Sequence, residues 1–287
     1  MPKTPPFSDI DLERWREYDG IYTDSLWLFD SRDKTGGHQL DYHGNFIPQI
    51  ATQILTRYTR TDDIVVDLFL GSGTSAIEAA RMGRRCIGVE LKADLVEYVR
   101  AKLPPGLLDR AQGDQGSRIH VMQGDSTTLE TLERVRDVLA SCGQKHAQLI
   151  MLHPPYHDIL RFSDSPADLS NAPDTERFLE QFHAAARNAY ALLEAKRFAC
   201  LVIGDKYTNG ELIPLGFLCM RKMNEAGFRT KAIVVKDIQG NERGKGRSAN
   251  LWRYRALSGG YYIFKHEYVI IFQKPLRRST SAVNCSR

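Results

Sequence analysis

Two short segments of this 287-residue chain carry residues whose types and spacing suit chemistry. The first runs from Asp67 to Thr74 (DLFLGSGT) and places two glycines between a predicted strand and a predicted helix, where nucleotide-like cofactors bind. The second is His153-Pro154-Pro155-Tyr156, a loop that two prolines stiffen and that ends in an aromatic ring. Together they predict a cofactor turn and a platform on which a flat ring can stack.

The glycine turn predicts a ligand site because Gly71 and Gly73 can adopt positive φ and let a ligand approach the backbone closely. Thr74 follows near the N-terminus of the next helix, where free N–H groups face a ligand, and Ser72 belongs to the same turn. The pattern Gly71-x-Gly73-x-x-Ala76 also fits a dinucleotide fingerprint, so an NAD-binding reductase stays open, although it leaves Pro-Pro-Tyr unexplained.

Two acidic positions extend this predicted cofactor site. Glu90 ends the next strand, a position from which an acid binds ribose hydroxyls in many nucleotide folds. Asp125, followed by Ser126, comes after the third strand and can accept a hydrogen bond from an adenine amino group. The alternative for Asp125-Ser126 is a helix cap before Leu129.

The Pro-Pro step predicts a rigid loop, and the resemblance that these two segments carry to enzymes acting on exocyclic amines implies an aromatic amine as its substrate. Its fixed φ angles aim the backbone carbonyls, and we expect the Pro154 carbonyl to accept one amine proton while His153 accepts the other. Neutral imidazole has an acceptor nitrogen and imidazolium has none, so activity is expected to fall at acid pH; a flat rate from about pH 5.5 to 8 would count against His153. Tyr156 would stack on an extruded base. The alternatives are a core histidine at a strand end and a stiff turn with a packed tyrosine.

In these two segments and their order, the chain resembles the DNA amino-methyltransferases, in a permuted arrangement, from about Asp41 to Lys274. The resemblance implies S-adenosylmethionine as cofactor and adds Asp67 and Phe69 to its site. It also implies that Asn45 and Phe46, in a segment like the family's opening motif, close over the cofactor; otherwise that segment is a plain turn into a helix. Adenine enzymes usually carry Asp or Asn before Pro-Pro-Tyr and cytosine-N4 enzymes usually carry Ser, so His153 leaves the base open.

Apolar runs and helical periods alternate along the chain, which predicts a parallel, doubly wound α/β sheet with ligands at the carboxyl ends of its strands. The predicted strands are Ile64–Leu70, Cys86–Leu91, Ile119–Gln123, Gln148–Leu152, Phe198–Gly204, Lys231–Lys236 and Tyr268–Gln273. The predicted helices are Ser75–Met82, Ala93–Lys102, Leu129–Ser141, Thr175–Leu193 and Leu212–Ala226. Only a long loop is expected between the last two strands, so the final strand is predicted to be antiparallel. The resemblance implies a Rossmann-like seven-stranded methyltransferase sheet.

The chain is predicted to divide into an aromatic-rich arm or lid (1–40), a catalytic domain (41–275) and a C-terminal tail (276–287). Within the domain, a basic loop over 236–260 is the predicted DNA-recognition segment, because cations neutralise phosphates and aromatic rings stack on bases. Its expected DNA-binding residues are Arg243, Lys245, Arg247, Trp252, Arg253 and Arg255. The alternative is a solvated charged loop. The segment from His157 to Asn171 is expected to border the base pocket. Little room remains for a separate recognition domain, which favours a short target site or a homodimer, and the resemblance brings in a restriction enzyme as a partner.

The composition of the chain limits the classes of function that are expected. The net charge of +4 is weak evidence for an anionic partner. Five dispersed cysteines predict reduced thiols and no zinc or other metal site. The chain has no apolar run long enough to span a bilayer and no apolar N-terminal leader. Together these features predict a cytoplasmic protein. The leading prediction is a site-specific DNA methyltransferase acting on adenine N6 or cytosine N4. An RNA or other amine methyltransferase and a catalytically silent DNA-binding protein are the alternatives.

Overall fold

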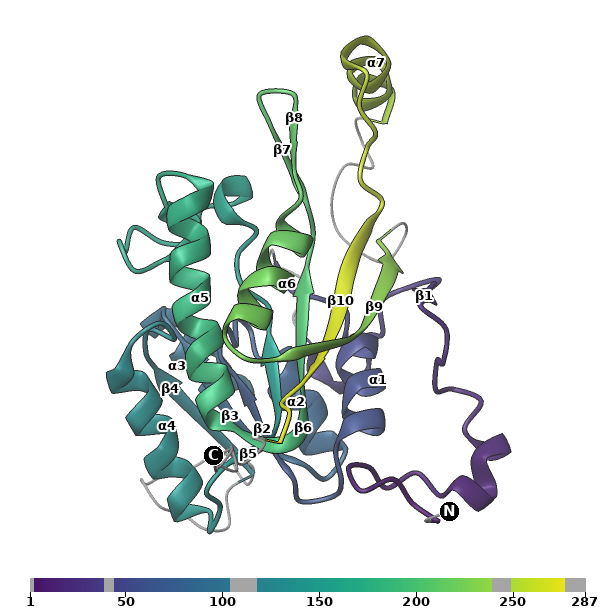
Figure 1. Cartoon of the computed structure of the whole chain (residues 1–287), viewed down its shortest axis with the longest axis vertical. Coiled ribbons are helices and arrows are strands. Elements are labelled where there is room, and N and C mark those ends of the chain that lie inside the picture. The colour runs from purple at the N-terminus through teal and green to yellow at the C-terminus, as the bar shows by residue number, and fades with distance from the viewer. Residues whose placement is uncertain (1–2, 39–43, 104–117, 239–248, 277–287) are drawn as a thin grey trace, which may run out of the picture.

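The computed structural model describes residues 3–38, 44–103, 118–238 and 249–276. Within them, eight strands form one sheet in the order β1-β9-β10-β6-β5-β2-β3-β4. These strands are β1 (Leu26–Trp27), β2 (Ile64–Asp67), β3 (Arg85–Glu90), β4 (Ile119–Gln123), β5 (Ala147–Leu152), β6 (Leu193–Ile203), β9 (Arg229–Asp237) and β10 (His266–Gln273). Strand β10 runs antiparallel to both of its neighbours, and the other pairs are parallel (Figure 1).

Helices cover both faces of the sheet (Figure 1). They are α1 (Pro48–Tyr58), α2 (Thr74–Arg81), α3 (Ala93–Lys102), α4 (Leu129–Ser141), α5 (Thr175–Leu192), α6 (Leu215–Glu225) and α7 (Ala249–Gly259). Short 3-10 helices are η1 (Leu12–Glu17), η2 (Thr35–Gly37), η3 (His157–Ile159) and η4 (Leu169–Asn171). Successive side chains of a strand point to opposite faces, so one core joins the sheet to α4, α5 and α6 and another joins it to α1, α2 and α3.

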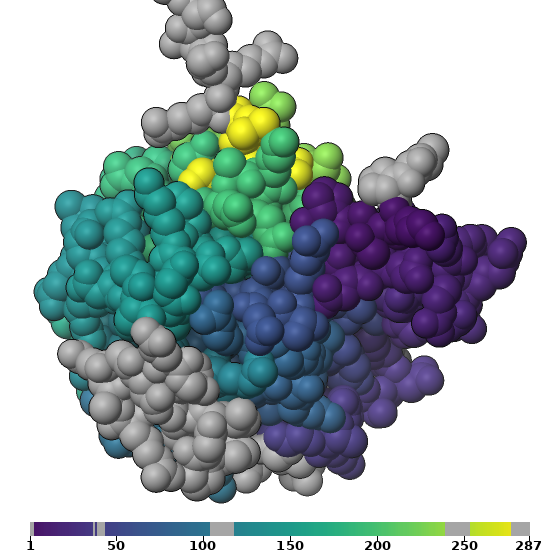
Figure 2. All heavy atoms as spheres, turned by 90° about the horizontal axis from the view of Figure 1, so that it is seen from below, coloured from purple at the N-terminus to yellow at the C-terminus, as the bar shows by residue number. Residues whose placement is uncertain are grey.

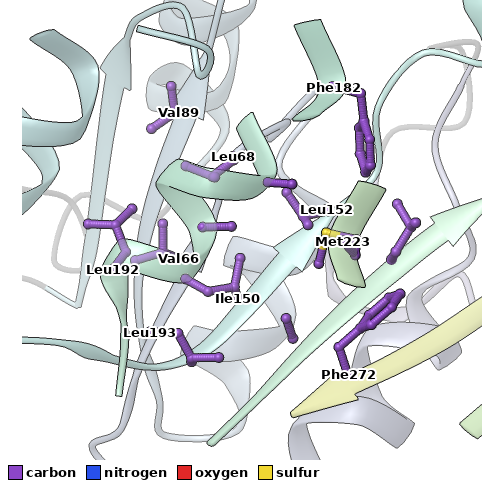
Figure 3. Close-up of a cluster of buried hydrophobic side chains, with 14 of the residues drawn as sticks. Val66, Leu68, Val89, Ile150, Leu152, Phe182, Leu192, Leu193, Met223 and Phe272 are labelled. Carbon is purple, nitrogen blue, oxygen red and sulfur yellow. The ribbon is translucent and has the colours of Figure 1, made fainter. Parts of the chain in front are cut away.

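The first of these cores is the one shown in Figure 3, where Val66, Ile150 and Leu152 of neighbouring strands meet Phe182 of α5 and Met223 of α6. All of these side chains are buried. A sheet covered on both faces needs nearly continuous apolar strands, which is why the strands of this chain could be predicted as uninterrupted apolar runs.

The predicted doubly wound fold is confirmed, and several of its elements differ from the prediction. All seven predicted strands are present, but the described sheet has eight, because Leu26–Trp27 adds an edge strand parallel to β9. The helix predicted from Leu212 begins at Leu215, after Pro214, because Leu212 belongs to a hairpin of β7 (Lys206–Thr208) and β8 (Glu211–Ile213). No helix bounds were predicted over the residues of α1, although a turn into a helix was the alternative given for the segment that contains Asn45 and Phe46.

The described part of the N-terminal segment packs against the sheet. Trp27 is only 2% exposed, and the Phe7 ring lies 4.9 Å from that of Phe198 on β6. Figure 2 shows the segment (purple) as a continuous patch at one side of the molecule. The predicted division of the chain near residue 40 stays a prediction.

Two elements project beyond the carboxyl edge of the sheet: the β7–β8 hairpin, and α7 between β9 and β10 (Figure 1). The segment 236–260 was predicted to be a loop. The second half of that prediction was wrong, because α7 occupies Ala249–Gly259. None of the described helices is long and apolar enough to cross a membrane.

Candidate active site

A cavity of about 360 Å³ opens at the carboxyl edge of the parallel strands. Both segments singled out in the sequence line it. Of the predicted site residues, the lining includes Asn45, Phe46, Phe69, Gly71, Thr74, Glu90, Asp125, Ser126, His153, Pro154, Pro155 and Tyr156. The structure therefore brings the glycine turn and the Pro-Pro-Tyr loop to one cavity. Asp67, Ser72 and Gly73 are not among the lining residues.

The glycine turn has the backbone geometry that its sequence predicts. Gly71 and Gly73 have φ of 56° and 88°, and Gly73 is the N-cap of α2. A Cβ on Gly73 would lie 3.1 Å from the Val99 side chain, so a larger residue is disfavoured by both backbone and packing. The Gly71 N–H donates to Glu90 Oε2 at 2.8 Å, which ties the turn to the end of β3.

Glu90 presents a carboxylate at the edge of the cavity. Its other oxygen, Oε1, accepts from the Lys92 N–H at 2.9 Å, and burial raises the pKa of the carboxyl from its ordinary value. A carboxylate accepts hydrogen bonds and donates none, so Glu90 suits a ligand that offers hydroxyls.

Asp67 does not face the cavity. It is 1% exposed, and its carboxylate accepts from the Phe69 N–H at 2.9 Å and from the Ser75 hydroxyl. Burial raises its pKa to about 6. Asp67 therefore joins the end of β2 to the first turn of α2, and its place in the cofactor site, which the resemblance implies, stays a prediction.

The opening motif links the two halves of the cavity. The Ser72 hydroxyl donates to Asn45 Oδ1 at 2.7 Å, which gives Ser72 a supporting position rather than a place in the lining. The Phe46 ring lies edge-on to His153 with centroids 5.2 Å apart. Tyr42 and His43, also part of this motif in the sequence, lie outside the described residues.

Asp125 lines the cavity and also shapes its own turn. Its Oδ1 accepts from the Thr127 N–H at 2.9 Å, and the Ser126 hydroxyl donates to the Leu68 carbonyl. The helix cap before Leu129 is formed by Thr128, whose hydroxyl accepts from the Thr131 N–H, and not by Asp125-Ser126. The cap alternative was therefore wrong in its residues.

The Pro-Pro-Tyr loop follows β5 and is held by a glutamate that had been assigned no role. Tyr156 donates its hydroxyl proton to Glu267 Oε2 at 2.8 Å and lies 3.3 Å from His153 Nε2. Burial lowers the pKa of His153 to about 4, so this imidazole is neutral throughout the neutral range. The fall in activity predicted at acid pH is therefore expected below about pH 5.5, because the pKa of His153 is lower than that of an ordinary histidine.

The segment after Tyr156 borders the cavity, as expected for residues 157–171, through Phe162, Asp168 and neighbouring apolar side chains. It is fastened by a cluster that sequence reasoning missed, in which His157 and Lys206 are buried and Asp158 is exposed. The Lys206 ammonium donates to His157 Nδ1 at 2.7 Å and pairs with Asp158. His157 adopts φ of 53° and is within hydrogen-bond distance of the Ala172 carbonyl at 2.9 Å.

The predicted DNA contacts are only partly described. Arg243, Lys245 and Arg247 lie outside the described residues. Arg253 and Arg255 lie exposed on α7, and Trp252 is on the same helix. The prediction that Lys236 belongs to the basic loop was wrong. Lys236 lies in β9, is fully buried, and forms an ion pair with Glu267 at 2.9 Å. Among the described residues, no three or more His, Cys, Asp or Glu side chains gather in a way that could hold a metal ion.

Known proteins resemble this chain in sequence and in fold. Residues 8–101 match a family model described as DNA methylase. The type II methyltransferase M.MjaII of Methanocaldococcus jannaschii is 36% identical over 112 residues, which are 34% of this chain and 21% of that protein. The probable type III restriction-modification enzyme HindVI Mod subunit of Haemophilus influenzae is 32% identical over 186 residues, 63% of this chain and 23% of that protein. The matches thus span less than a quarter of either relative. Among solved structures, TrmN from Thermus thermophilus shares the fold with a TM-score of 0.50 and 17% identity, over 81% of this chain and 50% of that one.

Proposed function

We propose that this chain, whose residues 8–101 match a family model described as DNA methylase, transfers a methyl group from S-adenosylmethionine to the exocyclic amine of a flipped DNA base, adenine N6 or cytosine N4. The observation that carries the proposal is the common cavity. The glycine turn with Glu90 lies on one side of it and the Pro-Pro-Tyr loop on the other. Methyl transfer needs the donor and the acceptor within one enclosed site, where positioning supplies much of the rate.

The lining of the cavity fits the proposed cofactor. Glu90 offers carboxylate oxygens suited to ribose hydroxyls, and Asp125 offers an acceptor suited to an adenine amine. The positive φ of Gly71 lets a ligand lie close to the backbone. When bound, S-adenosylmethionine supplies an electrophilic sulfonium methyl group.

The Pro-Pro-Tyr loop would hold the target base. The Pro154 carbonyl and the neutral His153 ring accept the two amine protons, which favours a tetrahedral, nucleophilic nitrogen. Tyr156 and Phe46 provide aromatic surface beside that position. A base inside a duplex cannot reach such a cavity, so it must leave the stack.

DNA would be bound by cations at the projecting end of the molecule. Arg253 and Arg255 are exposed on α7, which lies between β9 and β10 in the chain, and the predicted Arg243, Lys245 and Arg247 precede them in sequence. A homodimer and a restriction enzyme partner belong to the same proposal, since a relative is named as a Mod subunit of a restriction-modification enzyme.

Methyl transfer to defined nucleic acids tests the proposal. The protein is incubated with methyl-labelled S-adenosylmethionine and duplex DNA, single-stranded DNA or RNA, and the DNA of expressing cells is sequenced for modified bases. We expect N6-methyladenine or N4-methylcytosine at a short site, and a loss of at least about 10-fold in His153→Ala. His146→Ala, at a histidine outside the cavity lining, is the matched control.

The other functions give different results in the same assay. Transfer to RNA alone would identify an RNA methyltransferase. Cofactor binding without transfer to any nucleic acid would identify a catalytically silent binding protein. Either result overturns the proposed activity.

A further inference from the structure

Four side chains form a line from the interior of the sheet to the cavity. Lys236 Nζ lies 2.9 Å from Glu267 Oε1 and forms an ion pair rather than a directed hydrogen bond. Glu267 Oε2 accepts the Tyr156 hydroxyl proton at 2.8 Å, and the Tyr156 oxygen lies 3.3 Å from His153 Nε2. The first link follows from strand register, because Lys236 of β9 stands directly opposite Glu267 of β10.

The protons in this line can be assigned by counting donors. A tyrosine hydroxyl has one proton, and Tyr156 gives it to the Glu267 carboxylate in a charge-assisted bond. The Tyr156 oxygen can then only accept from His153, so Nε2 of His153 carries the ring proton. Nδ1 therefore has the lone pair, and the described residues place no hydrogen bond on it.

The buried Lys236 maintains the direction in which these side chains donate their hydrogen bonds. A carboxyl taken out of water without a cation tends to hold its proton, and a protonated Glu267 could donate to the Tyr156 oxygen. The Tyr156 proton would then turn to His153 Nε2, and Nδ1 would carry the ring proton. Lys236 is fully buried. Its ion pair with Glu267 therefore maintains Glu267 as a carboxylate that accepts hydrogen bonds.

We infer that the Lys236–Glu267 ion pair, acting through Tyr156, fixes His153 as the Nε2–H tautomer and so keeps Nδ1 available as the acceptor for the amine of the target base. The part that concerns the base rests on the proposed function. Lys236 and Glu267 are positioning residues, since they act through Tyr156 and neither holds the base amine.

Two further features support this assignment. Burial lowers the pKa of His153 to about 4, so the ring has a single proton to place at neutral pH. Asp205 and His266, which also line the cavity, belong to a second line of the same kind, in which Tyr268 donates to Asp205 Oδ2 at 3.0 Å and its oxygen lies 3.2 Å from His266 Nε2. This second line offers a control with the same chemistry at another histidine.

Nitrogen NMR of histidine-labelled protein at neutral pH tests the inference without any turnover. The His153 signals are assigned by their disappearance in His153→Gln, and the tautomer is given by which ring nitrogen is protonated. We expect Nε2–H in the wild type. In the double variant Lys236→Met/Glu267→Gln, which removes both buried charges together, the glutamine NH2 can donate to Tyr156, and we expect Nδ1–H at His153.

The controls separate this effect from a general disturbance of the cavity. Asp205→Asn is expected to change the tautomer of His266 and to leave that of His153 unchanged. Tyr156→Phe, which removes the linking oxygen without removing a buried charge, is expected to give His153 a mixture of tautomers. It also keeps the test available if the double variant does not fold.

The outcomes are distinct for the inference and for the proposed function. Nδ1–H in the wild type, or Nε2–H retained as the single form in both the double variant and Tyr156→Phe, overturns the inference. If the tautomers change as expected, kcat for DNA methylation should fall by about 10-fold or more in the double variant, while KM for DNA and for S-adenosylmethionine changes less than about 3-fold. Tautomers that change as expected in a protein that methylates no nucleic acid reject the proposed function and leave the control of His153 in place.

Discussion

Replacing Asp67 by asparagine tests the role that the structure gives to this carboxyl group. Asp67 accepts hydrogen bonds from the Phe69 N–H and the Ser75 hydroxyl and has no contact with water. In Asp67→Asn the amide oxygen can still accept from Phe69 and the amide NH2 can donate to the Ser75 oxygen. The substitution therefore removes the ionisation of this site while retaining its hydrogen-bond capacity.

The magnitude follows from the pKa of Asp67, which burial raises from 3.8 to about 6. Because the folded-state value lies above the unfolded one, the stabilisation by this group is complete below about pH 3.8 and is lost as the pH rises through about 6. Each pKa unit corresponds to about 1.36 kcal/mol, so the part lost between about pH 4.5 and 6 is about 2 kcal/mol. Asparagine does not titrate, so the free energy of unfolding of Asp67→Asn relative to wild type should rise by about 2 kcal/mol between about pH 4.5 and 7.5.

Urea unfolding of both proteins across this pH range measures the difference, with Asp137→Asn on the exposed face of α4 as the matched control. Calorimetry with S-adenosylmethionine adds a second measurement, and its affinity for Asp67→Asn should stay within about 3-fold of wild type because Asp67 does not line the cavity. Parallel stability profiles for wild type and Asp67→Asn would refute the account of the buried carboxyl. A loss of affinity beyond about 10-fold would restore Asp67 to the cofactor site.

Three further predictions concern the cavity and its surroundings. The methylation rate should be level from about pH 5.5 to 8 and should fall only as the pH approaches about 4, where His153 takes up a proton; a midpoint near 6.5 in initial rates would contradict its pKa. Gly204→Ala should lower kcat by about 10-fold or more in steady-state assays, since its Cβ would lie 2.9 Å from Tyr156 Cε2 and displace the ring; an unchanged kcat would show that the ring position is not critical. Arg253→Ala/Arg255→Ala should reduce the slope of log affinity against log salt by about 2 in DNA titrations, and an unchanged slope would remove α7 from the interface.

Two of these predictions have matched controls within the chain. Gly20→Ala adds the same methyl group where nothing lies within 4 Å, and it should leave kcat unchanged. Arg14→Ala/Arg16→Ala removes two exposed charges from η1, remote in sequence from the projecting helix, and should leave the salt dependence of DNA binding as in wild type.

The central strands and the cavity could be predicted because each rests on a local pattern. Apolar runs mark strands covered on both faces, and residues after parallel strands meet at one edge, so Gly71, Glu90 and His153 were brought together from sequence alone. The strand Leu26–Trp27 could not be predicted in this way, since two residues show no period and their pairing partner is Val235–Lys236. The β7–β8 hairpin did carry a signal, because Asn209-Gly210 is a favoured hairpin turn and both residues have positive φ, but it was not used.

The roles of charged residues were harder to predict than their positions. Lys236 begins a run of basic residues and was counted with them, although β9 continues to Asp237 and strand register places Lys236 opposite Glu267. Asp67 ends a strand beside the cofactor turn, yet its side chain points to Ser75. In both cases the role of the residue depends on the direction in which its side chain points. That direction is set by contacts between segments far apart in the sequence.

The parallel pairing of β1 with β9 has a consequence for biosynthesis. Leu26 and Trp27 are translated early, whereas Val235 and Lys236, their partners, are translated near the end of the chain. In a nascent polypeptide, the backbone of Leu26 and Trp27 therefore lacks its strand partner until β9 has been translated. In a polypeptide that lacks its N-terminal segment, β9 therefore has unpaired backbone groups along the edge that β1 covers, which favours pairing with other chains and aggregation.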